Sequence, residues 1–245
     1  MSRADRQDSR MELFRRGLRG GLPIGIGYFS VAFSFGIAAV SMGISWWEAV
    51  LISFTNLTSS GQFAGIGIIA ASGSYLEMAL TQLIINIRYT LMGISFSQKK
   101  AESFRGAKLL VLGHCITDEI FAVSMSSPGE IKAAYMAGLS ILPYIGWTGG
   151  TLAGAVLGNI LPSSVSDALG VMIYGMFIAI IVPAAKNERP VLMVVLLAVL
   201  ISCIIRFVPV FGFITGGFSI IICAVIASAF GATFFPVRKE DEYAA

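Results

Sequence analysis

Charged side chains are scarce in this 245-residue chain, where Asp, Glu, Lys and Arg make up 13% of the residues, against about 25% in typical soluble domains. Hydrophobic residues make up 56% and recur in stretches of about 16–25 residues, the length of transmembrane helices rather than of barrel strands. The scarcity of charge excludes a soluble globular protein. We therefore predict an all-α integral membrane protein, a polytopic bundle of about seven or eight hydrophobic segments.

Cysteine and histidine are also rare. Cys115, Cys203 and Cys223 stand singly in apolar stretches, which excludes a disulfide framework and a CxxC metal site. The single histidine, His114, excludes a multi-histidine metal site. Because HExxH, GxSxG and Walker motifs are absent as well, we expect no enzyme activity, no metal and no cofactor. Any uphill transport must then draw on an ion gradient or on exchange.

The basic residues gather outside the apolar stretches. Six arginines lie within residues 1–20, and Met11, Phe14 and Leu18 follow helical spacing, so residues 10–20 are predicted to form a basic amphipathic helix on anionic lipid rather than a nucleic-acid-binding arm. No secretory signal is evident, and the positive-inside rule places the N-terminus in the cytoplasm. We divide the chain into this amphipathic segment (1–20), a transmembrane domain (21–235) and a charged tail (236–245).

The predicted membrane segments are residues 22–42, 47–71, 75–97, 109–126, 131–160, 167–184, 191–208 and 212–235. The first is rich in glycine, which predicts close helix packing. The second is interrupted by hydroxyl, amide and glycine residues between Ser53 and Gln62, and such groups need partners in hydrocarbon. We predict that this helix breaks at membrane depth, as at the substrate sites of many transporters. An unbroken helix with one packed polar face is the alternative.

Loop charges bear on the path of segment 47–71. If it crosses fully, the loop 97–108, with four Lys or Arg residues, lies outside; if it enters and returns, the loop lies inside, as the positive-inside rule favours. The same path for 167–184 keeps Lys186 and Arg189 inside. Residues 22–97 and 142–207, each opening with Leu-Pro, would then form inverted repeats. A plain bundle of about seven or eight spans is the alternative.

Several charged groups lie inside the predicted spans. Asp118 and Glu119 fall in segment 109–126, where a charge near the bilayer centre costs roughly 2.5–3.5 kcal/mol. His114, four residues before Asp118, is expected on the same helix face, where the two could carry protons or form a structural hydrogen bond. Arg88 either pairs with these carboxylates, reaches the cytoplasmic surface or binds a substrate carboxylate.

Two further residues receive structural interpretations. Asp167 is predicted to cap the helix that follows it. Trp147, which stands among glycines, is predicted to pack or to anchor the helix.

Motifs along the chain resemble those of the AzlC-type branched-chain amino acid exporters. They are Leu22-Pro23 through Phe35-Gly36, Ser59-Ser60-Gly61-Gln62-Phe63, Asn86-Ile87-Arg88-Tyr89-Thr90-Leu91-Met92-Gly93, Thr117-Asp118-Glu119 and Trp147-Thr148-Gly149-Gly150-Thr151. The resemblance extends over residues 20–235, although Gly61 stands where the family usually has serine. It implies the large permease subunit of a bacterial inner-membrane exporter of valine-like amino acids, working with a small AzlD-type membrane subunit.

The motifs and the polar interruption together predict two sets of site residues. The expected substrate-binding residues are Thr55, Asn56, Ser59, Ser60, Gly61, Gln62, Asn86 and Arg88. The expected proton-coupling or ammonium-binding residues are Asp118, Glu119 and His114. Two other functions are compatible with the same residues: a passive channel for small polar solutes, and a membrane scaffold in which polar groups only join helices.

Overall fold

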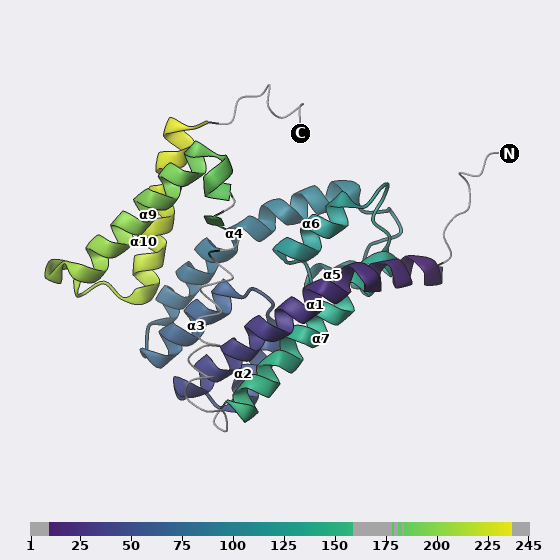
Figure 1. Ribbon diagram of the computed structural model, residues 1–245, viewed down its shortest axis with the longest axis horizontal. Helices are drawn as coiled ribbons and strands as arrows, with labels where there is room; N and C mark the ends of the chain where they lie inside the picture. The colour runs from purple at the N-terminus through teal and green to yellow at the C-terminus, as the bar shows by residue number, and fades with distance from the viewer. Residues whose placement is uncertain (1–9, 159–177, 179–180, 183, 237–245) are drawn as a thin grey trace. The chain divides into compact units, whose positions relative to one another are not determined.

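The computed structural model describes residues 10–158, 178, 181–182 and 184–236, and the described part of the chain is helical (Figure 1). The chain divides into two compact units, Met1–Ile66 with Asn86–Met172 and Gly67–Ile85 with Ile173–Ala245. The helices are α1 (Arg10–Ser41), α2 (Trp46–Thr55), α3 (Ser60–Ala70), α4 (Tyr75–Lys99), α5 (Ala107–Gly113), α6 (Asp118–Ser126), α7 (Ala133–Leu157), α9 (Arg189–Phe207), the 3₁₀ turn η1 (Pro209–Phe211) and α10 (Gly216–Phe234).

Three helices among the described residues, α1, α9 and α10, are long and apolar enough to cross a membrane by length and composition. The predicted all-α membrane fold is confirmed to this extent, and the count of seven or eight segments stays a prediction. The expected segment 167–184 and the cap at Asp167 lie outside the described residues, apart from a few positions of the segment after residue 177.

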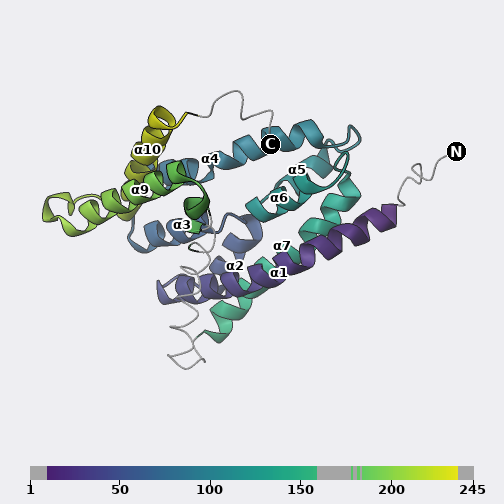
Figure 2. The same ribbon diagram turned by 45° about the horizontal axis from the view of Figure 1, so that its top comes forward.

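The first unit is built on α1 and α7, which lie side by side in both ribbon views (Figures 1 and 2). Gly21 lies against the carbonyl of Leu139, Gly25 against that of Leu142, and Gly36 against that of Thr151. Residue numbers at these contacts increase in the same direction along α1 and α7, so the two helices run parallel. The close packing predicted from the glycines of the first span is confirmed, with α7 as the partner helix.

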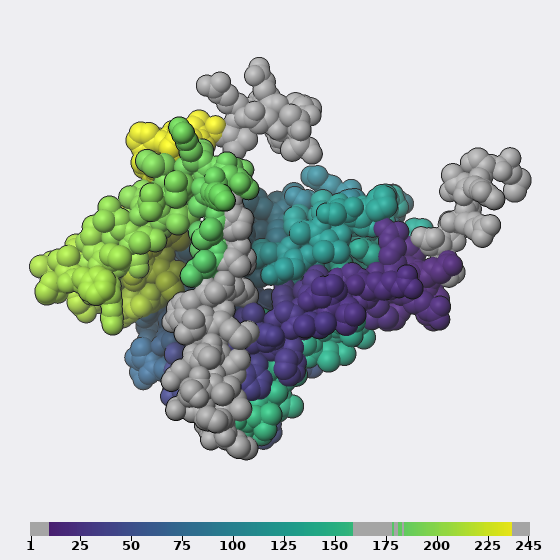
Figure 3. Space-filling view, viewed as in Figure 1, coloured from purple at the N-terminus to yellow at the C-terminus, as the bar shows by residue number. Residues whose placement is uncertain are grey.

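Helix α1 is also longer than predicted. It begins at Arg10 and continues without a break to Ser41, so the expected amphipathic segment 10–20 and the first span form one helix. Within this first part, Gly17 lies against the backbone of α7 at Tyr135 and Leu139. Figure 3 shows α1, in purple, along the surface of this unit.

Neighbouring glycines of α7 allow a direct test of this packing. A β-carbon at Gly150 would collide with the carbonyl oxygen of Phe29, whereas one at Gly149 meets nothing within 4 Å. Gly150→Leu is expected to destabilise the protein by about 3 kcal/mol or more, because the obstacle is backbone and the helices must separate. Gly149→Leu is the matched control and should be neutral or slightly stabilising, since leucine favours helix over glycine by roughly 1 kcal/mol. Thermal unfolding in detergent measures both, and equal losses would contradict the packing.

The predicted break in segment 47–71 is present between α2 and α3, at Asn56–Ser59. Ile66 of α3 packs in one buried cluster with Ile44 and Ala49, which lie before and within the first turns of α2. The Gln62 amide also bonds to Ser53 Oγ at 3.0 Å, although nine residues separate them. The chain therefore turns back between α2 and α3, and both helices contribute to one buried cluster. We call this pair the α2–α3 hairpin; it is consistent with a segment that enters and returns.

The predicted unbroken span 109–126 is wrong, because the chain leaves the helix after Gly113 and starts α6 at Asp118. Each piece is too short to cross a hydrocarbon core of about 30 Å. The ends of this segment also meet: Ala101 N–H donates to Ile131 at 3.0 Å, Ile131 N–H donates to Lys99 at 2.9 Å, and Lys99 Nζ bonds to the Met125 carbonyl. Helices α5 and α6 thus form a second folded-back segment.

The proposed pairing of residues 22–97 with 142–207 as inverted repeats is not confirmed. Inverted counterparts cross a membrane in opposite directions, whereas α1 and α7, which open the two stretches, run parallel. A different pattern occurs twice in the structure, namely a long helix followed by two short helices. Helix α1 precedes the α2–α3 hairpin, and α4 precedes the α5–α6 hairpin.

The second unit contains α9 and α10, joined through η1, together with the first part of α4. Glu77, in the first turn of α4, is only 3% exposed. Its carboxylate accepts hydrogen bonds from the Thr215 hydroxyl and, at 3.0 Å, from Gly217 N–H at the start of α10. A carboxylate is favourable there because the N–H groups of a helix start carry partial positive charge.

Candidate functional site

A buried hydrogen-bond network joins the α2–α3 hairpin to α7. Gln62, 2% exposed, accepts from Trp147 Nε1 at 2.9 Å and donates to Ser53 Oγ at 3.0 Å. Ser53 Oγ lies 2.7 Å from Thr151 Oγ1, which donates to the Trp147 carbonyl at 3.1 Å. Every polar group named here has a partner, so these residues hold the two halves of the hairpin against α7.

Tyr28 of α1 extends this network to α6. Its ring packs edge-on against Trp147, with centroids 5.3 Å apart. Its hydroxyl lies 2.6 Å from Thr117 Oγ1 and donates to the Glu119 carboxylate. Through Tyr28 and Trp147, the start of α6 is linked to Gln62 at the start of α3. The two broken helices therefore share one set of side-chain contacts.

Local sequence explains why α6 begins where it does. Thr117 is its N-cap and accepts from Ile120 N–H, and Asp118 and Glu119 occupy the first turn, where carboxylates are favoured by the helix dipole. The carboxylates therefore lie at a helix start, and the expectation that they lie in the middle of a continuous span is wrong.

Asp118 is paired with Arg88 of α4, at 2.5 Å between Oδ2 and Nη1. Arg88 also lies over the ring of Tyr89, 5.1 Å from its centroid. Of the roles considered for Arg88, pairing with a carboxylate is the one present in the structure. Among the described residues no basic side chain forms an ion pair with Glu119, whose carboxylate is held by Tyr28.

The break between α2 and α3 holds hydroxyl groups that have no partner in the part of the chain that the structure describes. Asn56 Oδ1 accepts from Thr58 N–H at 3.1 Å and so shapes the turn. Thr58 Oγ1 and Ser59 Oγ are buried and make no hydrogen bond to a described residue. Ser59 has φ +46°, a left-handed conformation that is costly for a side-chain-bearing residue. Unpaired buried hydroxyls on a strained turn mark the part of the site best suited to contact a ligand.

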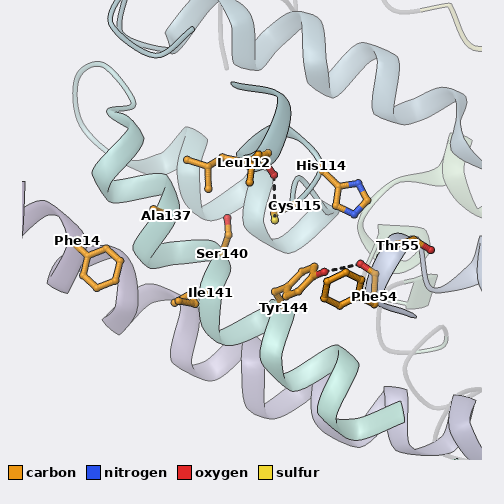
Figure 4. A pocket seen from close by; sticks show the side chains of 11 residues that line it. Phe14, Phe54, Thr55, Leu112, His114, Cys115, Ala137, Ser140, Ile141 and Tyr144 are labelled. Atoms are coloured by element: carbon orange, nitrogen blue, oxygen red, sulfur yellow. Dashed lines mark hydrogen bonds between the residues drawn. The ribbon is translucent and has the colours of Figure 1, made fainter. Parts of the chain in front are cut away.

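Two predicted site residues lie elsewhere. The break after Gly113 separates His114 from Asp118, so the expected one-turn contact on a common helix face is wrong. His114 instead lines a cavity of about 650 Å³ together with Thr55 and Tyr144 (Figure 4). Thr55 Oγ1 donates to the Leu51 carbonyl at 2.8 Å.

The remaining predicted residues are on the elements described. Ser60, Gly61 and Gln62 form the first turn of α3. Asn86 lies two residues before Arg88 on α4, so the two side chains leave the helix on nearly opposite sides. Sequence reasoning missed Tyr28, Thr58 and Thr117 as parts of the site. The Thr-Asp-Glu pattern is a helix-start signal that could have identified Thr117.

Comparison with known proteins identifies the family. The family model described as AzlC protein matches residues 23–161. An uncharacterised membrane protein of Archaeoglobus fulgidus is 33% identical over 74% of this chain and 80% of its own length. The inner membrane protein YgaZ of Escherichia coli is 28% identical over 72% of this chain and 75% of its own.

A more distant relative carries a functional name. The branched-chain amino acid transport protein AzlC of Bacillus subtilis is 22% identical over 72% of this chain and 69% of its own. No solved structure matches. The matched region contains both broken helices and every residue of the Tyr28–Trp147–Gln62 network, and the chain belongs to the AzlC family of membrane proteins.

Proposed function

We propose that this chain is a secondary transporter that exports branched-chain or similar apolar amino acids across the bacterial inner membrane, driven by the proton gradient. The observation that carries the proposal is the pair of folded-back helices whose broken ends share the Tyr28–Trp147–Gln62 contacts. Broken helices that meet inside a bundle are the usual substrate sites of secondary transporters. Membership of a family linked to branched-chain amino acid transport supports the substrate class.

The break at Asn56–Ser59 binds the substrate carboxylate in this proposal. The start of α3 presents N–H groups and the positive end of the helix dipole. The unpaired hydroxyls of Thr58 and Ser59 add two donors. Gln62, held by Trp147 and Ser53, keeps this end of α3 in place rather than contacting substrate.

Glu119 is the better candidate for the ammonium or the coupling proton. Asp118 is neutralised by Arg88, so a substrate ammonium would have to compete with a guanidinium for it. Glu119 carries a hydrogen bond from Tyr28 and no paired cation among the described residues. A proton or an ammonium group on Glu119 would therefore change the contact that links α6 to Tyr28 and Trp147. Arg88 and Asp118 act as a pair that holds α6 against α4.

Basic residues support a cytoplasmic location for one end of the first unit. Arg16, near the start of α1, donates to Ser127 Oγ at 2.8 Å, and Lys99 donates to the Met125 carbonyl. These bonds bring together three segments: the start of α1, the loop 97–108 and the segment before α7. Most basic residues of the unit lie in these segments. We place them in the cytoplasm by the positive-inside rule. A small AzlD-type membrane subunit completes the transporter in this proposal.

Transport in proteoliposomes tests the proposal. Vesicles with this chain, with and without the small subunit, would be loaded with labelled valine, leucine or methionine. Saturable efflux that is accelerated by an opposing proton gradient and by external unlabelled substrate is the expected result. Unsaturable downhill flow, insensitive to pH, would instead indicate a channel. Absence of any flux with the small subunit present would indicate a scaffold.

The unpaired hydroxyls give a prediction about affinity. Thr58→Val and Ser59→Ala are each expected to raise the substrate KM about 3- to 10-fold, the equivalent of one hydrogen bond, without lowering thermal stability. Ser53→Ala is the control, because its hydroxyl bonds to Gln62 and Thr151 inside the protein. That variant should lower stability by about 1–2 kcal/mol. If Thr58→Val and Ser59→Ala behave like Ser53→Ala, the hydroxyls are structural and do not contact substrate.

A further inference from the structure

An apolar groove runs along α7 on the side of α5. It consists of two adjoining hollows of about 650 and 480 Å³, which share Phe14, Leu112 and Ala137 as lining residues. Figure 4 shows the larger hollow, with Phe14 at one end, Tyr144 near the other, and Ala137 and Ser140 along α7 between them. The groove therefore follows one face of α7 from the start of the helix to the tips of both hairpins.

The length of the groove fits one leaflet of a bilayer. Its lining on α7 extends from Ala133 to Tyr144, which at about 1.5 Å per residue corresponds to roughly 16 Å. One leaflet of a hydrocarbon core of about 30 Å is about 15 Å deep. Small side chains at Ala133 and Ala137 leave space that the neighbouring Phe14 and Leu112 do not fill.

The two ends of the groove differ in charge. Arg10 and Lys108 line the end at the start of α7, and no carboxylate among the described residues lines either hollow. Neither basic residue forms an ion pair with a described residue. A third hollow of about 350 Å³, on the α1–α7 surface around Leu22 and Ile145, has no charged residue among its described lining residues. Basic residues thus line this groove, whereas the described lining of the third hollow contains none.

We propose that this groove binds one molecule of an anionic phospholipid, with an acyl chain along α7 and the phosphate between Arg10 and Lys108. The apolar length takes the chain, and the two cations at its cytoplasmic end take the negative headgroup. The lipid chain ends beside Phe54 and Tyr144, whose hydroxyl donates to the Phe54 carbonyl at 2.6 Å. Bound lipid then lies against the tips of both hairpins. A transmembrane helix of another subunit would not require two unpaired cations at one end of the groove.

Lipid binding to the purified full chain tests this proposal independently of transport. Native mass spectrometry would compare phosphatidylglycerol with phosphatidylcholine of the same acyl chains. The wild type is expected to bind the anionic lipid roughly 30-fold more tightly, the effect of two nearby cations. In R10Q/K108Q this preference should disappear. The control K100Q/R105Q removes the same charge from residues that do not line the groove, and it should keep the preference.

A second variant tests the acyl-chain part of the groove. Ala137→Phe fills the region shared by both hollows and is expected to weaken binding of both lipids at least tenfold. If it does not fold, a photoreactive residue at Leu112 replaces it and should cross-link to lipid in membranes. Equal binding of the two lipids by the wild type, equal losses in R10Q/K108Q and K100Q/R105Q, or a cross-link from Leu112 to protein would each overturn the proposal.

Discussion

Export activity is expected to fall about tenfold or more when either Arg88 or Asp118 is neutralised alone, and to recover substantially when both are neutralised. The two side chains form an ion pair at 2.5 Å. In Arg88→Gln, Asp118 keeps its charge and loses its partner; in Asp118→Asn the same happens to Arg88. Each side chain is 44% exposed, so the cost is expected at about 1–3 kcal/mol, below that for a fully buried pair. The double variant leaves no uncompensated charge.

A double-mutant cycle measures this coupling. Export per folded molecule and thermal stability in detergent would be determined for the two single variants and for Arg88→Gln/Asp118→Asn. Recovery in the double variant identifies the pair as the structure that holds α6 against α4. A double variant that folds as well as the wild type and remains inactive would assign Arg88 or Asp118 to substrate instead. Glu119→Gln is the comparison, since Glu119 has no paired cation among the described residues and its loss should not be rescued by changing Arg88.

The two helix breaks differ in how well they can be predicted from the sequence. Asn56–Ser59 places four adjacent residues, three of them polar, between strongly apolar flanks, so the cost of polar groups in hydrocarbon was enough to predict a break. The second break covers His-Cys-Ile-Thr, without glycine or proline inside it, and two of its four residues are apolar. Treating residues 109–126 as one helix then put His114 and Asp118 on a common face.

Side-chain partners were less predictable than the elements themselves. Tyr28 and Glu119 are 91 positions apart, and nothing in a single sequence pairs them. The glycines of α1 predicted close packing, but the choice of α7 and its parallel direction depend on how the intervening hairpins return the chain. Pairing with Asp118 or Glu119 was one of three roles considered for Arg88, because opposite charges in a membrane need partners. The sequence left these roles open, and the structure shows the pair with Asp118.

Removing the Gln62 amide is expected to destabilise the first unit by about 2–4 kcal/mol, the sum of an orphaned buried donor and a lost hydrogen bond. In Gln62→Leu, Trp147 Nε1 loses its acceptor while remaining buried, and Ser53 loses the amide that donates to it. Trp147 also packs against Tyr28, which holds Glu119, so we expect substrate turnover to fall together with stability. Gln98→Leu, at an exposed position of α4, is the control and should change neither.

The partner of this bond provides the sharper measurement. Trp147→Phe removes the donor while keeping an aromatic ring against Tyr28, and it should cost less in a Gln62→Leu background than in the wild type, by about 1 kcal/mol. Unfolding in detergent, followed by size-exclusion of the remaining folded protein, gives the four stabilities required. Strictly additive losses would mean that Gln62 and Trp147 do not act through their hydrogen bond. If the two substitutions are coupled in unfolding free energy but turnover is unchanged, the network only holds the hairpin in place. The contacts from Gln62 through Trp147 and Tyr28 to Glu119 would then have no role in transport.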